Sequence, residues 1–87
     1  MHEASLMTSL MRQIETLAAA EGARQVTSIA VRLGAHSHMS PSHFAEHFKE
    51  ASASGVAAGA RLDITVSDET DDPYAADILL QSVEIEA

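Results

Sequence analysis

The chain is predicted to fold as an α/β two-layer sandwich, with two helices on one face of a three-stranded mixed sheet. Two observations lead to this prediction: apolar side chains recur at helical spacing in two segments, and they alternate with polar ones in others. The elements follow in the order α-β-α-β-β. A strand–helix–strand unit favours a right-handed parallel crossover. A last strand after a short loop favours an antiparallel neighbour, and helices on one face bury the apolar side of the sheet.

The first two elements are a helix over residues 4–21 and a strand over residues 28–33. Apolar residues of the helix recur at helical spacing, and they are Leu6, Met7, Leu10, Ile14 and Leu17. Gly22 follows as a C-terminal cap. In the strand, apolar residues alternate with polar or small ones, which indicates one buried face, and Gly34 ends it.

The third element is a helix that opens at Ser40-Pro41, with a hydroxyl at the N-cap position and proline in the first turn. Phe44 and Phe48 lie one helical turn apart, so both are expected to face the sheet. The segment 52–55 ends this helix. Because the chain has only three aromatic residues, the core is predicted to be mainly aliphatic.

The last two strands are predicted over residues 62–66 and 78–85, joined by an acidic loop over residues 67–77. In the final strand, the apolar residues of the first half have one parity and those of the second half have the other. They are Ile78 and Leu80 in the first half, and Val83 and Ile85 in the second. A bulge at Gln81 or Ser82 would restore both pairs to one face.

Length and composition predict a single domain over residues 1–87. The net charge of −8 disfavours nucleic acid and membrane surfaces as partners. The sequence has no apolar run that could cross a membrane and no secretory signal pattern. Cysteine is absent, which excludes thiolate zinc sites and fits a cytoplasmic location. No nucleophile motif or phosphate-binding loop is present, so no enzymatic activity is expected.

The triplet Met1-His2-Glu3 is the strongest functional signal. The α-amine of Met1 and the ring nitrogen of His2 can close around one metal ion, and the amide nitrogens of His2 and Glu3 can complete a four-nitrogen set. This tetragonal geometry suits Ni(II) or Cu(II) better than Zn(II) or Mg(II). The alternative is a flexible terminus that happens to carry a histidine.

Several longer segments extend this signal. They are Met1-His2-Glu3-Ala4-Ser5-Leu6, Gly22-Ala23-Arg24-Gln25-Val26, Val31-Arg32-Leu33-Gly34, Gly59-Ala60-Arg61-Leu62-Asp63-Ile64 and Ser82-Val83-Glu84-Ile85-Glu86. Together they resemble the HypA/HybF family of nickel-insertion proteins, accessory factors for NiFe hydrogenase and, in some bacteria, urease. The resemblance covers roughly residues 1–66 and 77–86.

The resemblance implies a nickel metallochaperone, a carrier that binds Ni(II) through Met1, His2 and Glu3 for delivery during hydrogenase or urease maturation. It also implies two partners, a GTPase accessory protein and the hydrogenase large subunit. The alternative is a metal-independent adaptor in metalloenzyme assembly that has lost delivery. Because an unused chelate would have no reason to stay at the terminus, the triplet favours the carrier.

The sequence departs from the family pattern in the loop over residues 67–77. The family carries a zinc-binding insertion with two Cys-x-x-Cys pairs between the last two strands. Here only the acidic loop stands in that place, so no structural zinc is expected.

A second departure is a cluster of histidines, which are His36, His38, His43 and His47. His43 and His47 are four residues apart on a predicted helix, so they share a face and can bind one ion as a pair. His36-x-His38 precedes the helix, and the four imidazoles together form a candidate second transition-metal site, which would serve a different metal. The alternative is a solvated helix flank beside the two phenylalanines.

Overall fold

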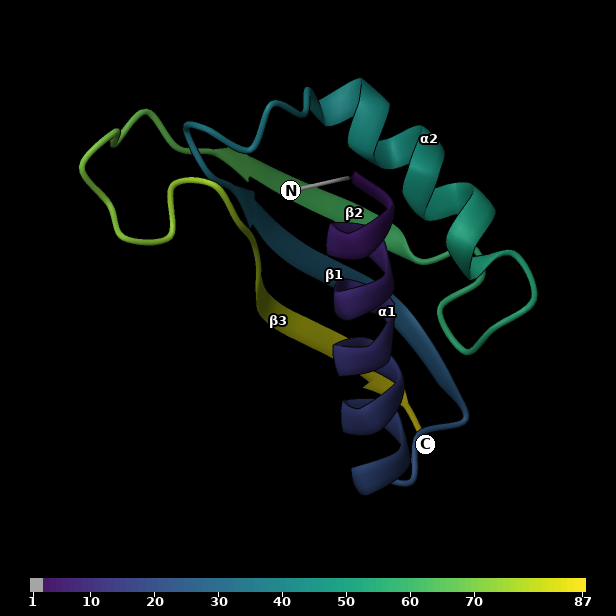
Figure 1. Cartoon of the computed structure of the whole chain (residues 1–87). Helices are drawn as coiled ribbons and strands as arrows, with labels where there is room; N and C mark the ends of the chain where they lie inside the picture. Colours follow the sequence, from purple (N-terminus) through teal and green to yellow (C-terminus); the bar gives the residue numbers. More distant parts are fainter. Residues whose placement is uncertain (1–2) are drawn as a thin grey trace.

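The computed structural model describes residues 3–87, and within them it has the predicted two-layer architecture (Figure 1). Two helices lie on one face of a three-stranded sheet. The elements are α1 (Glu3–Ala20), β1 (Gln25–Leu33), α2 (Pro41–Ser52), β2 (Arg61–Val66) and β3 (Ile78–Glu86). The strand order is β2-β1-β3, with β1 parallel to β2 and antiparallel to β3. The predicted fold class is therefore confirmed.

The helix ends follow local sequence signals. After α1, Gly22 adopts a positive φ of 64°, and the amide of Ala23 donates to the carbonyl of Ala18 at 2.9 Å. This pattern closes the helix with the glycine cap that the sequence predicts. At the start of α2, the hydroxyl of Ser40 accepts from the amide of His43 at 3.2 Å, which satisfies one of the unpaired donors of the first turn.

The predicted bulge in β3 is present at Gln81. Ala30 of β1 lies opposite Ser82, whereas the next residue, Val31, lies opposite Leu80. Gln81 is thus the extra residue of the bulged strand. As a result, the apolar residues on both sides of the bulge reach the same core, and those that pack there are Ile78, Leu80 and Val83.

The core lies between the helices and the sheet and is mainly aliphatic. Phe44 and Phe48 of α2 are 0% and 2% exposed, with ring centroids 5.9 Å apart, as the helical spacing predicts. On α1 the buried face differs from the sequence pattern, because it also includes Met11 and because it changes at the end of the helix. Leu17 is 41% exposed, and Ala18 is buried in its place. The buried stripe of α1 continues from Ile14 to Ala18, four residues on, so the larger side chain falls on its flank.

Among the described residues, no helix has both the length and the apolar character that crossing a membrane requires.

Candidate metal centre

The nickel triplet predicted from the sequence lies at the start of α1. Met1 and His2 are outside the described residues, and Glu3 is the first residue of the helix. The first four amide groups of an α-helix have no intrahelical carbonyl to donate to. The amide of Glu3 is one of these groups, so the helix does not use the nitrogen that the proposed chelate needs.

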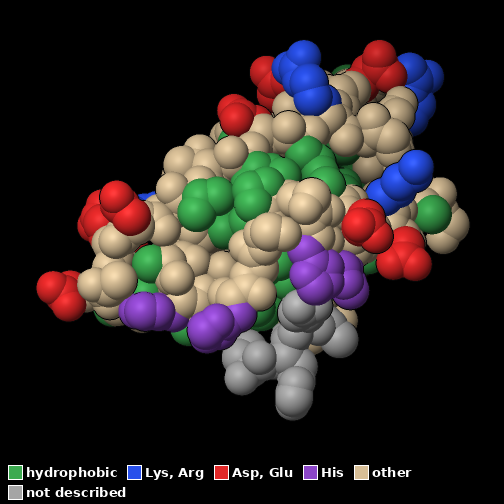
Figure 2. All heavy atoms as spheres, turned by 90° about the horizontal axis from the view of Figure 1, so that it is seen from above, with side chains coloured by type: hydrophobic (Ala, Val, Ile, Leu, Met, Phe, Trp, Pro, Cys, Tyr) green, Lys and Arg blue, Asp and Glu red, His purple; other side chains and the backbone are tan. Residues whose placement is uncertain are grey.

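His43 and His47 lie side by side on α2. Their Nε2 atoms are 2.9 Å apart, and their ring centroids are separated by 4.6 Å with a tilt of 49° between the ring planes. Both side chains are half-buried. Histidine side chains gather along one edge of the face in Figure 2. The helical spacing of four therefore brings the two imidazoles together as predicted.

The histidine pair lies beside a groove between α1 and α2. His47 lines the groove from α2, together with Glu50 and Ala51, whereas Met7 and Thr8 line it from α1. Met7 and Met11, whose thioethers are soft metal ligands, are only 5% and 8% exposed. They belong to the core, where flexible thioether side chains fill gaps between less adaptable neighbours.

His36 and His38 lie in the connection between β1 and α2. The amide of His36 donates to the carbonyl of Ala75 at 2.7 Å, and His38 has a positive φ of 57°. Within residues 3–87, no group of three or more metal-ligating side chains comes together. Of the four histidines in the candidate second site, the structure brings only His43 and His47 into contact.

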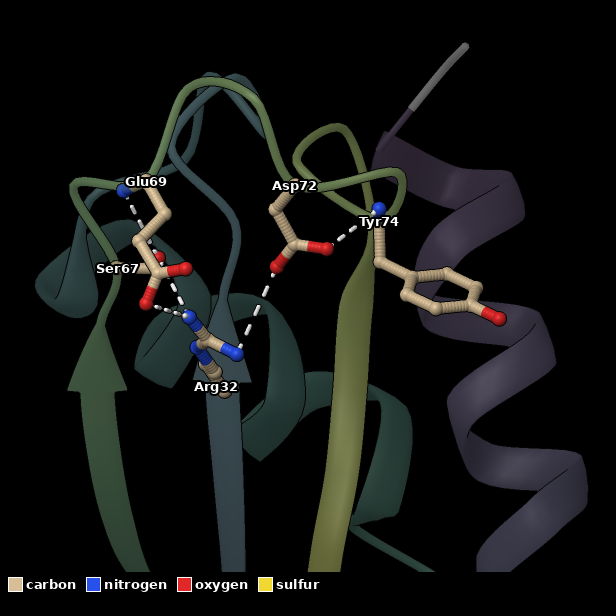
Figure 3. A network of polar contacts seen from close by, with 5 residues as sticks. All are labelled: Arg32, Ser67, Glu69, Asp72 and Tyr74. Carbon is tan, nitrogen blue, oxygen red and sulfur yellow. Dashed lines mark hydrogen bonds and ion pairs between the residues drawn. The ribbon is translucent and has the colours of Figure 1, made fainter.

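Sequence reasoning missed a polar network around Arg32 (Figure 3). The Nη2 atom of Arg32 donates to the hydroxyl of Ser67 at 2.8 Å and to the carboxylate of Glu69 at 3.3 Å. Its Nη1 atom lies 3.6 Å from a carboxylate oxygen of Asp72, whose other oxygen accepts from the amide of Tyr74 at 2.9 Å. The sequence shows an arginine in a predicted strand and an acidic loop further along the chain, but nothing in it places the two side by side.

The network shows what the acidic loop does in the fold. The side chain of Asp72 is 15% exposed and that of Arg32 is 25% exposed. Two of the loop carboxylates therefore face one guanidinium, which binds the loop to β1. This arrangement agrees with the loop as a connector between strands and differs from an open cluster of carboxylates for a hard cation.

The fold of this chain is shared with a solved structure. It matches the solution structure of the Ni metallochaperone HypA from Helicobacter pylori with a TM-score of 0.81, over 100% of this chain and 99% of the other, at 22% sequence identity. At this identity the match establishes a shared fold. A comparison with curated protein sequences gives no match.

The family follows from the sequence model that matches residues 1–70, described as hydrogenase/urease nickel incorporation, metallochaperone, HypA. Because the match covers most of the chain, the protein belongs to the HypA family, as the resemblance of its segments predicted. The family consists of metallochaperones for nickel incorporation, which are carriers and not catalysts. The matched region includes the N-terminal triplet and the His43–His47 pair, and it ends within the acidic loop.

Proposed function

We propose that this protein carries Ni(II) at its N-terminus for incorporation into hydrogenase or urease. The ligands are the α-amine of Met1, the ring nitrogen of His2 and the amide nitrogens of His2 and Glu3. The observation that carries the proposal is the start of α1 at Glu3, within a family match that includes the whole triplet. The helix makes no intrahelical use of the Glu3 amide, so ligation costs no helical hydrogen bond.

The end of a helix also suits the chemistry of this ligand set. An amide nitrogen must lose its proton before it can bind a metal ion in the tetragonal set. The N-terminal end of a helix carries a partial positive charge, which stabilises the resulting negative charge on the amide of Glu3. Metal binding releases protons in such a site, so nickel affinity is expected to fall in acid. Release at the terminus can then occur without unfolding of the domain.

The partners of this proposed function are the hydrogenase large subunit and a GTPase accessory protein. The net charge of −8 supports recognition of a basic surface, since electrostatic complementarity raises association rates. Glu3 adds negative charge at the delivery site itself.

The proposal further assigns residues 1–87 to one nickel-binding domain in which the loop 67–77 replaces the zinc insertion of the family. The Arg32 network supports this assignment because it fastens the loop to β1 through side-chain hydrogen bonds and ion pairs. The fold of this domain is then expected not to depend on structural zinc.

Nickel titration of the untagged protein tests the terminal site. Ni(II) should bind at the terminus with the absorption spectrum of a square-planar, diamagnetic complex. His2→Ala should abolish this spectrum, and so should one residue added before Met1, because each change removes a ring of the chelate. Cu(II) should bind at least as tightly, following the usual order of divalent affinities. An unchanged spectrum and affinity in both variants would contradict the site, and no nickel binding by the parent protein would favour the adaptor function.

A further inference from the structure

We propose that His43 and His47 form a separate metal-binding site, a two-imidazole chelate for one divalent transition-metal ion such as Ni(II) or Cu(II). Their Nε2 atoms are 2.9 Å apart, on side chains that lie one turn apart on α2. The assignment rests on this contact and on the surroundings of α2. It does not depend on the N-terminal chelate, which uses other residues.

The separation of the two nitrogens fits a right angle at a metal ion. A bond from a metal to an imidazole nitrogen is about 2.0–2.1 Å long. Two such bonds at a right angle place the nitrogens about 2.9 Å apart, and a tetrahedral angle places them about 3.4 Å apart. The observed 2.9 Å corresponds to neighbouring positions in a tetragonal complex. Ni(II) and Cu(II) favour that geometry.

The orientation of the rings agrees with a shared ion. A straight hydrogen bond of this length would place the ring centres about 5 Å apart, whereas they are 4.6 Å apart and tilted by 49°. The contact is therefore bent away from a straight line, as it would be for two rings that converge on one ion. Without metal, one ring donates its Nε2 proton to the other. A bound ion takes the place of this proton, which moves to Nδ1 of the same ring so that both Nε2 lone pairs face the metal.

The core holds this pair in place. Phe44 and Phe48 directly follow the two histidines in the sequence, and both are buried. Their packing fixes the rotation of α2 about its axis, so the histidines stay on the flank next to α1. Because both rings are half-buried and already in contact, binding a metal requires little additional ordering of side chains.

The position of the pair suits a protein that handles metal ions. His47 lines the groove opposite Met7 and Thr8. Glu3 begins α1 four residues before Met7, which corresponds to about 6 Å along the helix axis. The imidazole site thus lies beside the helix end that bears the nickel triplet. A second ion held there would lie near the start of α1, within a chain whose net charge of −8 attracts cations.

Calorimetric titration with Ni(II) and Cu(II) in the full chain carrying His2→Ala tests the site, because that change removes the terminal chelate. One equivalent should still bind and raise the melting temperature, since a ligand that binds only the folded state stabilises it. Adding His43→Ala and His47→Ala should abolish both effects. Circular dichroism should show an intact α2, since alanine is the best helix former.

A relocated histidine provides the matched control. Ser42→His combined with His43→Ser keeps the number of histidines but spaces the pair by five residues, which moves one ring to another face of α2. In the His2→Ala protein, this variant should lose the metal ion that the pair binds. The double change His36→Ala, His38→Ala should retain that ion. Absence of binding in the His2→Ala protein would overturn the separate site, as would binding that survives loss of both His43 and His47. If the terminal chelate does not form, His2→Ala will not change the number of metal ions that the protein binds. This result is distinct from failure of the His43–His47 site.

Discussion

Truncation of Phe44 tests how the helices are fixed on the sheet. Phe44 is 0% exposed and stacks on Phe48 with ring centroids 5.9 Å apart. Replacing a fully buried phenylalanine by alanine costs about 3–5 kcal/mol of unfolding free energy, because apolar contacts are lost and a cavity remains. A chain of this length has a total stability of about 4–13 kcal/mol. Phe44→Ala is therefore expected to remove about a quarter or more of the stability, and it can unfold a marginal domain.

Urea denaturation followed by circular dichroism measures this loss. In a domain of this size, each 1 kcal/mol lowers the melting temperature by about 4–8 °C, so Phe44→Ala should melt at least about 12 °C earlier. The dependence of the unfolding free energy on urea should stay unchanged if only stability changes. Phe44→Leu keeps the site apolar and should fall between the parent and the alanine variant. This leucine variant gives a measurable value even if the alanine variant does not fold.

The matched control is Leu17→Ala. Leu17 is 41% exposed, so its truncation should change the unfolding free energy by less than about 1 kcal/mol. If Phe44→Ala and Leu17→Ala cost the same, or if Phe44→Ala costs less than about 1 kcal/mol, the assignment of Phe44 to the centre of the core would be refuted.

The remaining predictions concern the loop between β2 and β3, its contacts with β1, and the dependence of the fold on metal. Gly34→Ala should cost about 1–3 kcal/mol, because its Cβ would overlap the backbone of Ala75; Gly55→Ala, whose Cβ would make only ordinary contacts, is the control in the same denaturation assay. Arg32→Met should cost about 1–3 kcal/mol through lost charge-assisted hydrogen bonds. It should also speed amide hydrogen exchange in residues 67–77, and unchanged exchange there would contradict the network. Chelator treatment should leave the protein folded, and unfolding on chelation would reveal a structural metal site.

Local signals explain why so much of the fold could be predicted. The glycine cap at Gly22 and the hydroxyl cap at Ser40 depend on a few neighbouring residues, and the sequence contains those residues. The bulge at Gln81 followed from the parity of apolar residues within one strand. The Arg32 network and the tight contact at Gly34 could not be predicted, because they join segments more than 30 residues apart in the chain.

The candidate metal sites also differ in whether local sequence alone determines their geometry. The contact of His43 with His47 follows from helical spacing alone, so the sequence was sufficient for it. Whether His36 and His38 join them depends on the path of the connection after β1, where the backbone of His38 takes a left-handed conformation. An irregular segment has no repeating backbone geometry, so the sequence alone does not show which way its side chains point. The triplet at the terminus stays a prediction from its chemistry, which needs no tertiary contact.

The strand order explains why the loop between β2 and β3 needs a firm attachment. Since β1 lies between these two strands, the loop must pass over the end of β1. The amide of Ser67 donates to the carbonyl of Leu33, and the amide of Gly34 donates to the carbonyl of Asp77, each at 2.9 Å. Both ends of the loop are thus tied to β1, and Arg32 binds its middle. These bonds come from residues of this chain alone, so a short acidic segment can close this end of the sheet.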